Sequence, residues 1–142
     1  MKKTIIICLS LLSMSSFSQC VECESFAEAQ KNAEKVKSIQ INSYMSNEKN
    51  EIPDSIEKYI NLEELYLTDL NLKIIPKGIG KLKKLKSVSF AGNNLKTLPE
   101  EIFQLQNLEE LILFSNKFTK TYKDNLKKEV KLKLPKTKLM ID

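Results

Sequence analysis

Apolar residues recur with a fixed period along the middle of the chain. The same pattern begins at Leu62, Leu85 and Leu108, so the three copies start 23 residues apart. Within each copy, apolar and polar residues first alternate, and apolar residues then return at every third position. The alternation predicts a short strand with one buried face, and the spacing of three predicts a short 3₁₀ or helical segment. One such coil cannot cover its own apolar edge, so the period predicts a solenoid of stacked coils.

The second copy shows every position of the pattern. Val88-Ser89-Phe90 is the alternating stretch, and Gly92-Asn93 lies where the chain must turn out of the strand. Leu98-Pro99 ends the turn, and the steps of three begin at Ile102. The pattern resembles that of the leucine-rich repeat family, in which leucines and one asparagine recur as L-x-x-L-x-L-x-x-N-x-L-x-x-L-P.

The resemblance implies both a fold and a class of function. The implied fold is an α/β right-handed leucine-rich repeat solenoid, with a parallel sheet on its concave face and short helical segments on its convex face. The implied function is non-catalytic binding, and no particular reaction. Two positions depart from the pattern. Leu70 replaces the turn asparagine of the first copy, which predicts an incomplete asparagine ladder, and Thr121-Tyr122 replaces Leu-Pro in the third copy, where we expect the regular array to end.

The flanking sequences divide the chain into four parts. They are a signal peptide (1–18), a cysteine pair with a capping helix (19–37), about four repeats (38–121) and a C-terminal cap (122–142). We expect an N-terminal helix over 24–37 with Ser25 as its N-cap, and a hidden first strand near Ile39. The polar loop at 42–51 carries three extra residues. A helix over 122–134, ended by Pro135, and a last short strand at 138–141 would close the other end.

The first 18 residues have the features of a bacterial secretory signal. Lys2-Lys3 precede an apolar stretch, and Ser16-Phe17-Ser18 would place a cleavage site before Gln19. The apolar stretch is shorter than the roughly 20 residues of a spanning helix. We therefore expect an exported protein that is secreted, periplasmic or on the cell surface, with no stable membrane span. A lipid anchor on Cys20 is the less favoured alternative, because Gln19 fits a lipoprotein cleavage site poorly.

The composition excludes several kinds of chemistry. All 23 basic residues are lysines, and the chain contains neither histidine nor arginine. A Ser-His-Asp or Cys-His catalytic arrangement and a histidine metal site are therefore excluded, and an arginine fork for phosphate or guanine is missing. We expect no enzyme activity, no metal, no cofactor and no nucleic-acid partner.

The net charge of +5 is distributed unevenly along the chain. Residues 117–142 hold nine lysines and three acidic residues, whereas residues 19–116 have a net charge of −3. The basic character therefore belongs to the tail. Binding of anionic polymers or a membrane surface by this tail is the main alternative function.

Two of the three cysteines would remain after removal of the signal. Cys20 and Cys23 have a Cys-x-x-Cys spacing that permits a local disulfide in an oxidising compartment. The same spacing occurs at redox-active sites, where it lowers a thiol pKa. A redox site of that kind has a strand before the pair and a helix after it. After removal of the signal, almost nothing would precede this pair. We favour an inert bridge or unpaired thiols over a redox role.

The predicted binding surface is the concave face of the sheet. The residues that flank the buried strand leucines point from this face, and they do not repeat between copies. Apolar side chains there are candidates for an interface, because no coil needs them in its core. We expect a monomer that binds a protein or peptide partner. The candidate binding residues are Tyr66, Thr68, Glu64, Ser87, Ser89, Glu110, Ile112 and Phe114.

Overall fold

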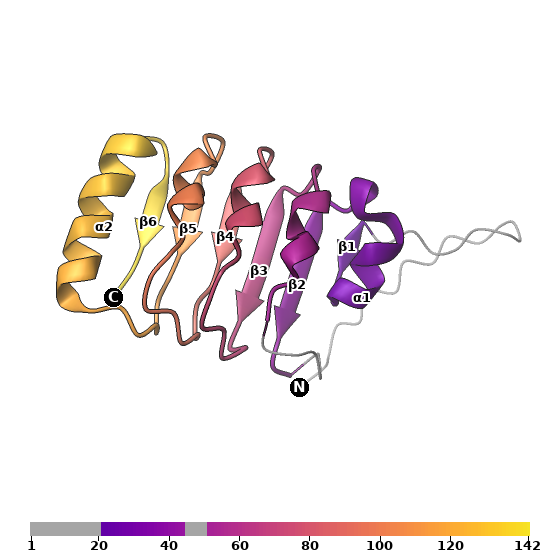
Figure 1. The fold of residues 1–142 in the computed structure, drawn as a ribbon, viewed down its shortest axis with the longest axis horizontal. Helices are drawn as coiled ribbons and strands as arrows, with labels where there is room; N and C mark the ends of the chain where they lie inside the picture. The colour runs from indigo at the N-terminus through magenta and orange to yellow at the C-terminus, as the bar shows by residue number, and fades with distance from the viewer. Residues whose placement is uncertain (1–20, 45–50) are drawn as a thin grey trace, which may run out of the picture.

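A parallel β-sheet runs through the length of the computed structural model, which describes residues 21–44 and 51–142. Its strands follow the chain order β1-β2-β3-β4-β5-β6, and helical segments cover one side of it (Figure 1). The strands are β1 (Glu22–Cys23), β2 (Ser38–Asn42), β3 (Glu64–Thr68), β4 (Ser87–Ser89), β5 (Glu110–Ile112) and β6 (Lys138–Met140). The helical segments are α1 (Phe26–Ala29), η1 (Gln30–Lys35), η2 (Asp54–Lys58), η3 (Lys77–Lys81), η4 (Glu100–Gln104) and α2 (Lys120–Lys133).

The register of the sheet follows the sequence period. Leu65 pairs with Val88, and Val88 pairs with Leu111, so equivalent positions of the copies lie side by side. The same rung continues to Ile39 at one end and to Leu139 at the other. The four rung residues from Ile39 to Leu111 are fully buried. The prediction of stacked coils with an apolar rung facing the interior is confirmed.

Three 3₁₀ segments line the side of the core opposite the sheet. Each of η2, η3 and η4 begins after a proline with φ between −63° and −68°, a value that the pyrrolidine ring imposes. Ile56, Ile79 and Ile102 point inward from these segments and are fully buried. Because η3 packs against both η2 and η4, the segments stack in the same order as the strands.

Asparagine side chains join successive coils where the chain leaves the strands. The Asn93 carboxamide accepts hydrogen bonds from the backbone N–H groups of Leu70 and Leu72, and donates to the carbonyl oxygen of Leu67 at 2.7 Å. Asn116 makes equivalent contacts with the coil before it, accepting from the N–H of Leu95 at 3.0 Å. At the equivalent position of the previous coil, Leu70 has no side-chain carboxamide that could make these bonds. The prediction of an incomplete ladder is therefore confirmed.

The N-terminal part corrects the prediction of a single helix over 24–37. Ser25 does cap α1, accepting a hydrogen bond of 3.1 Å from the N–H of Glu28. The α-helix spans only Phe26–Ala29, and a 3₁₀ segment follows, in which Asn32 leaves helical geometry with φ −148° and ψ 53°. Asparagine favours such breaks because its side chain competes for backbone hydrogen bonds.

A further strand, which the sequence did not predict, precedes this helix. Strand β1 is two residues long and pairs Cys23 with Ile39 of β2. Its buried residue, Cys23, lies 16 positions before Ile39, so the 23-residue period gives no signal for it. The sheet is therefore longer at this end than the predicted coils alone would make it.

At the C-terminal end, α2 and β6 complete the last coil. Thr119 starts the helix by accepting a hydrogen bond of 3.2 Å from the N–H of Tyr122, so α2 begins at Lys120, before the expected Tyr122. Leu126 and Val130 of α2 are buried against the core. Strand β6 adds the expected final strand beside β5. Among the described residues, no helix is long and apolar enough to cross a membrane.

Some predictions concern residues outside the described ranges. They are the signal peptide, Cys20 and most of the polar loop at 42–51. These stay predictions from the sequence.

Candidate binding face

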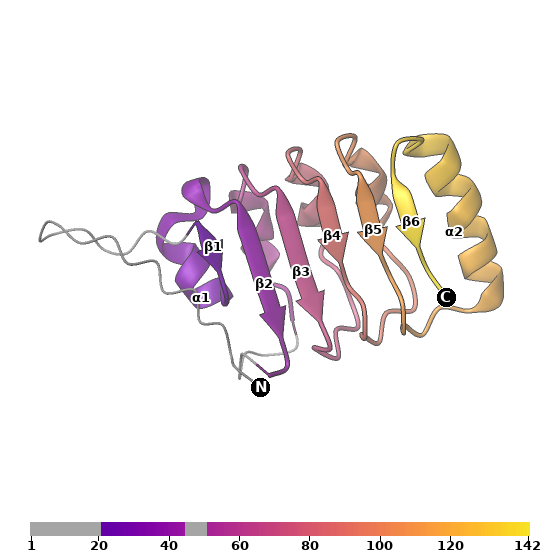
Figure 2. The same cartoon turned by 180° about the vertical axis from the view of Figure 1, so that it is seen from behind.

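The sheet presents one face to the core and the other away from it, and Figure 2 views the molecule from the strand side. Side chains alternate along each strand, so the parallel register places the outward residues in columns across the sheet. We call the outward side the sheet face and define it by two columns. The first contains Ser38, Glu64, Ser87, Glu110 and Lys138, and the second contains Gln40, Tyr66, Ser89, Ile112 and Met140.

Hydrogen bonds connect the polar residues of the sheet face. The Ser38 hydroxyl donates to the Glu64 carboxylate at 3.1 Å. The Tyr66 hydroxyl donates to Ser87 Oγ at 2.9 Å, and Ser87 Oγ in turn reaches the Glu110 carboxylate at 3.5 Å. These bonds run from strand to strand, so they fix the orientation of Tyr66 and of both carboxylates.

An apolar patch occupies the part of the sheet face nearest the C-terminal end. We define this patch as Ile112, Phe114 and Met140. Ile112 and Met140 are neighbours in the second column and are half-buried, and Phe114 lies just beyond β5 with 41% of its surface exposed. The backbone carbonyl of Phe114 accepts a hydrogen bond of 3.0 Å from the N–H of Gly92, which fixes the chain at this point.

Charges alternate in a row along the edge of the sheet face where the strands begin. We call the row Lys37, Glu63, Lys86 and Glu109 the charged rim. Glu63 forms ion pairs with Lys86 at 2.6 Å and with Lys37 at 3.4 Å. Hydrogen bonds from Lys86 and then from Lys37 lower the pKa of the Glu63 carboxyl below its ordinary value. The bond to Glu63 raises the pKa of Lys86.

A shallow hollow of about 310 Å³ lies between the charged rim and the first column. Four carboxylates and one ammonium group line it, together with a phenol and a hydroxyl. The hollow therefore has an excess of negative charge on its walls. The lining residues are Glu63, Glu64, Tyr66, Lys86, Ser87, Glu109 and Glu110.

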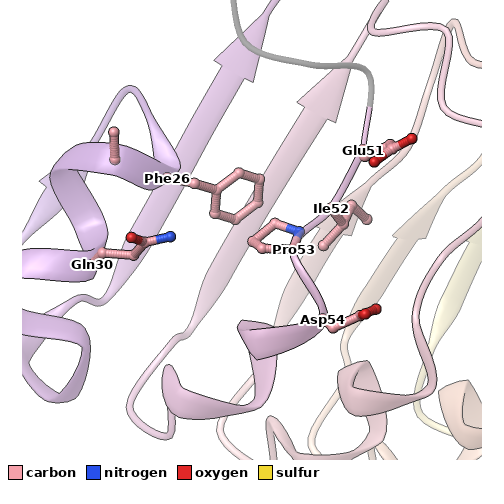
Figure 3. Close-up of a pocket in the computed structure, with 7 residues that line it drawn as sticks. Phe26, Gln30, Glu51, Ile52, Pro53 and Asp54 are labelled. Carbon is pink, nitrogen blue, oxygen red and sulfur yellow. The ribbon is translucent and has the colours of Figure 1, made fainter.

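A second hollow lies at the other side of the molecule, between α1 and the segment leading into η2. Its volume is about 410 Å³, and Figure 3 shows the Phe26 ring directed toward Pro53 across it, with the Glu51 and Asp54 carboxylates turned outward. A neighbouring hollow of about 540 Å³ shares Glu51, Ile52 and Asp54. Neither hollow was predicted. The first lies between α1 and the segment before η2, the second lies between that segment and residues 71–76, and the repeat period indicates neither arrangement.

The structure places every predicted binding residue on the sheet face or at the ends of its strands. Tyr66 and Ile112 share a column with Ser89 between them, as the repeat predicts. Ser89 is only 5% exposed, however, so it separates the two larger side chains without offering a surface of its own. Lys138 and Met140 belong to the same face but were not predicted, because β6 carries no copy of the repeat.

Cys23 lies in the core rather than at an accessible site. It is 1% exposed and disulfide-bonded, and its sulfur partner is not among residues 21–44 and 51–142. Pairing with Cys20 stays a prediction. A redox-active thiol has to be accessible to its substrate, so this burial favours a structural bridge. Within the same described ranges, no group of three potential metal ligands comes together.

The predicted basic tail corresponds to α2, β6 and the loops beside them. Lys120, Lys127 and Lys131 lie on one exposed side of α2, because their spacing of seven and four residues is helical. Lys133 instead pairs with Glu129 at 3.0 Å and lies 4.4 Å from the centre of the Phe103 ring.

Comparison with known proteins agrees with this geometry. Residues 60–118 match the family model described as "Leucine rich repeat". A solved leucine-rich repeat protein of Leptospira interrogans is similar with a TM-score of 0.54 and 33% sequence identity over 73% of this chain. The match covers 24% of that protein, so the chain spans about a quarter of its length. No curated protein matches.

Proteins with this fold are typically non-enzymatic modules that bind other proteins, and their curved sheets supply the binding surface. In this chain the repeat period, the rung from Ile39 to Leu139 and the asparagine contacts between coils all have the form expected of such a fold. Together with the matches to the family model and to the solved structure, they identify the chain as a leucine-rich repeat protein.

Proposed function

We propose that this protein binds a protein or peptide partner through the sheet face and has no catalytic role. The observation that carries the proposal is the apolar patch, because its side chains lie where the core needs none. Phe114 is 41% exposed at this position. Large apolar and aromatic groups at such sites become buried when a partner covers them, and they supply much of the binding free energy in interfaces.

The dimensions of the sheet face favour a segment of protein over a small molecule. Six parallel strands at about 4.8 Å spacing span roughly 24 Å, the length of about seven extended residues. The hollow between the rim and the first column is shallow and polar. Sites for small ligands are usually deeper and mostly apolar.

The carboxylates of the sheet face do not favour catalysis. Glu64 and Glu110 lie two strands apart, about 10 Å between their backbones. Both carboxylates are half-exposed and accept hydrogen bonds from serine hydroxyls. A general acid works in a site that encloses the substrate, and this open face does not enclose one.

We also propose that the protein acts after export from the cytoplasm of a bacterium. Support comes from the charged and apolar start of the chain and from the disulfide at Cys23, since disulfides persist in oxidising compartments. Expression of the full chain in a bacterium, followed by N-terminal sequencing of the periplasmic and secreted fractions, tests this. A mature chain that begins at Gln19 is expected, and retention of Met1 in the cytoplasm would contradict export.

The binding proposal is tested by removing the apolar patch without disturbing the core. Ile112→Ser combined with Phe114→Ser should abolish capture of partners that the unaltered protein retains, as measured by quantitative mass spectrometry of affinity-captured proteins. Leu132→Ser is the matched control, because Leu132 is apolar and 79% exposed but lies on α2, away from the sheet face. An unchanged set of captured proteins would place the binding surface elsewhere.

A further inference from the structure

We propose that the partner of the sheet face carries a lysine or arginine side chain close to an apolar one. The basic group enters the hollow between Glu64 and Glu110, and the apolar group packs on Ile112 and Phe114. This inference rests on the proposed function, because it specifies the chemistry of the partner that occupies the same face.

The first argument is the balance of charge around the hollow. Lys86 is the one cation among its lining residues, and its ammonium group is engaged by Glu63 at 2.6 Å. Glu64 and Glu110 have no ion pair within the described part of the chain. Lys138 neighbours Glu110 in the first column but is exposed and forms no ion pair with it. A cationic side chain in the hollow would therefore meet a field that the protein itself leaves uncompensated.

The second argument is the orientation of the groups that line the hollow. Ser38 and Ser87 donate to Glu64 and Glu110 from within the sheet, and each ionised carboxylate still has further acceptor positions. The Tyr66 hydroxyl is directed to Ser87, which holds the phenol beside the hollow. A guanidinium or ammonium group there can donate hydrogen bonds to the carboxylates and pack against the negative face of the ring.

The third argument is the distance between the hollow and the apolar patch. Ile112 follows Glu110 by two residues on β5, which is about 7 Å along a strand. The centre of the hollow lies about one strand spacing to the side, so the two sites are roughly 8 Å apart. Residues two positions apart in an extended peptide project from the same side at about 7 Å. The surface therefore fits a peptide with a basic residue and an apolar residue separated by one position.

A random heptapeptide display library tests this without a known partner. The probe is the library itself, selected against the full chain and against Glu64→Gln combined with Glu110→Gln, a change that keeps shape and removes charge. Glu57→Gln is the matched control, since Glu57 is exposed on η2, on the opposite side of the molecule. Selections at low and moderate salt separate specific binding from general attraction.

The expected result is at least fivefold enrichment of peptides with lysine or arginine two positions from an apolar residue. That enrichment should persist with Glu57→Gln and disappear with the double glutamine variant. If peptides are enriched without basic residues but still require Ile112 and Phe114, the partner chemistry is wrong while the proposed function stands. If enrichment is absent, or independent of all sheet-face variants, both are overturned.

The basic helix α2 offers one competing occupant, which the same variants detect. Analytical ultracentrifugation would show concentration-dependent self-association if α2 of a second copy filled the hollow. Loss of that association in the double glutamine variant would assign the hollow to a second copy and overturn its assignment to a separate peptide. A species that remains monomeric at every concentration supports the separate peptide.

Discussion

The side-chain oxygen of Asn93 accepts a hydrogen bond of 3.0 Å from the backbone N–H of Leu72, which belongs to the preceding coil. The same side chain donates to the carbonyl oxygens of Leu67 and Phe90 at 2.7 and 2.9 Å. It is 2% exposed, so water cannot replace these bonds. Asn93 therefore acts as a bracket that joins the turns of two coils.

Asn93→Ala should lower the free energy of unfolding by about 2–4 kcal/mol, because it leaves buried backbone groups without partners. Urea denaturation followed by circular dichroism measures the change. Asn94→Ala is the control, since within residues 21–44 and 51–142 the Asn94 side chain bonds only the exposed Asn71 side chain, at 3.3 Å. Equal effects of the two substitutions would contradict a bracketing role.

Tyr122→Phe should destabilise the C-terminal end by about 1 kcal/mol. The Tyr122 hydroxyl accepts a hydrogen bond of 2.7 Å from the N–H of Leu98, and the ring stacks on Phe118 at 5.3 Å. Phenylalanine keeps the stacking but leaves the Leu98 N–H without its acceptor. Faster amide hydrogen exchange at Leu98 would locate the effect, and unchanged exchange there would contradict it.

Gly92→Ala should destabilise the fold by about 1–3 kcal/mol, because Gly92 has a φ of +69° that a side chain disfavours. An added Cβ would also meet the Asp69 carboxylate. Gly78→Ala is the control, since Gly78 has no positive φ and its nearest neighbour would be Ile56 Cγ2 at 3.2 Å. Thermal unfolding compares the two, and a larger loss for Gly78→Ala would argue against strain at the turn.

Neighbouring residues on β5 should respond to substitution in opposite ways. Leu111→Ala should cost about 2–5 kcal/mol, because Leu111 is fully buried and its removal leaves a cavity. Ile112→Ser should cost much less, since Ile112 is half-buried on the sheet face, but it should weaken partner binding. Parallel measurements of unfolding and of peptide capture test the separation. A Leu111→Ala chain as stable as the unaltered protein would refute the buried rung.

Glu63→Gln should reduce the dependence of stability on pH in acid. Hydrogen bonds from Lys86 and Lys37 lower the pKa of Glu63 in the folded protein from its ordinary value of 4.5. The folded state therefore releases this proton more readily than the unfolded state. Its contribution to stability is present above pH 4.5 and is lost as the pH falls through the folded pKa.

Urea midpoints of both proteins at pH 7 and pH 3 check this expectation. The unaltered protein should be more stable than Glu63→Gln at pH 7, and the difference should shrink at pH 3. Because Glu63 is partly exposed and both lysines are exposed, added salt should also reduce the difference at pH 7. A difference that is equal at both pH values would show that protonation of Glu63 does not change the stability of the protein.

The repeats could be predicted because one physical requirement recurs in them. Val88 and Leu111 must meet as neighbours if each coil is to bury its edge, so their spacing along the chain also determines which outward residues share a column. The hydrogen-bonded positions of Tyr66 and Ser87 could not be predicted, because they depend on rotamers and not on spacing. Met140 was missed because β6 lies outside the period, although its place next to Ile112 completes the apolar patch.

The ends of the molecule were harder to predict because local preferences compete there without support from the repeat. Phe26 and Ala29 are buried as the helical pattern required. At Asn32, however, the backbone leaves helical geometry, and the apolar pattern does not indicate where this break occurs. Strand β1 has one inward side chain, Cys23, and a single position cannot reveal an alternation.

The charged rim limits how the array can lengthen by duplication of its own sequence. Lysine and glutamate alternate from Lys37 to Glu109, so copying any single coil would place two like charges on adjacent strands, which is unfavourable. Copying two adjacent coils together would preserve the alternation. Leu62-Glu63-Glu64-Leu65 and Leu108-Glu109-Glu110-Leu111 share the same letters, whereas the copy between them carries Lys86-Ser87. Duplication of a pair of coils is therefore the change that this charged rim accommodates, although a single coil is the repeating unit of the core.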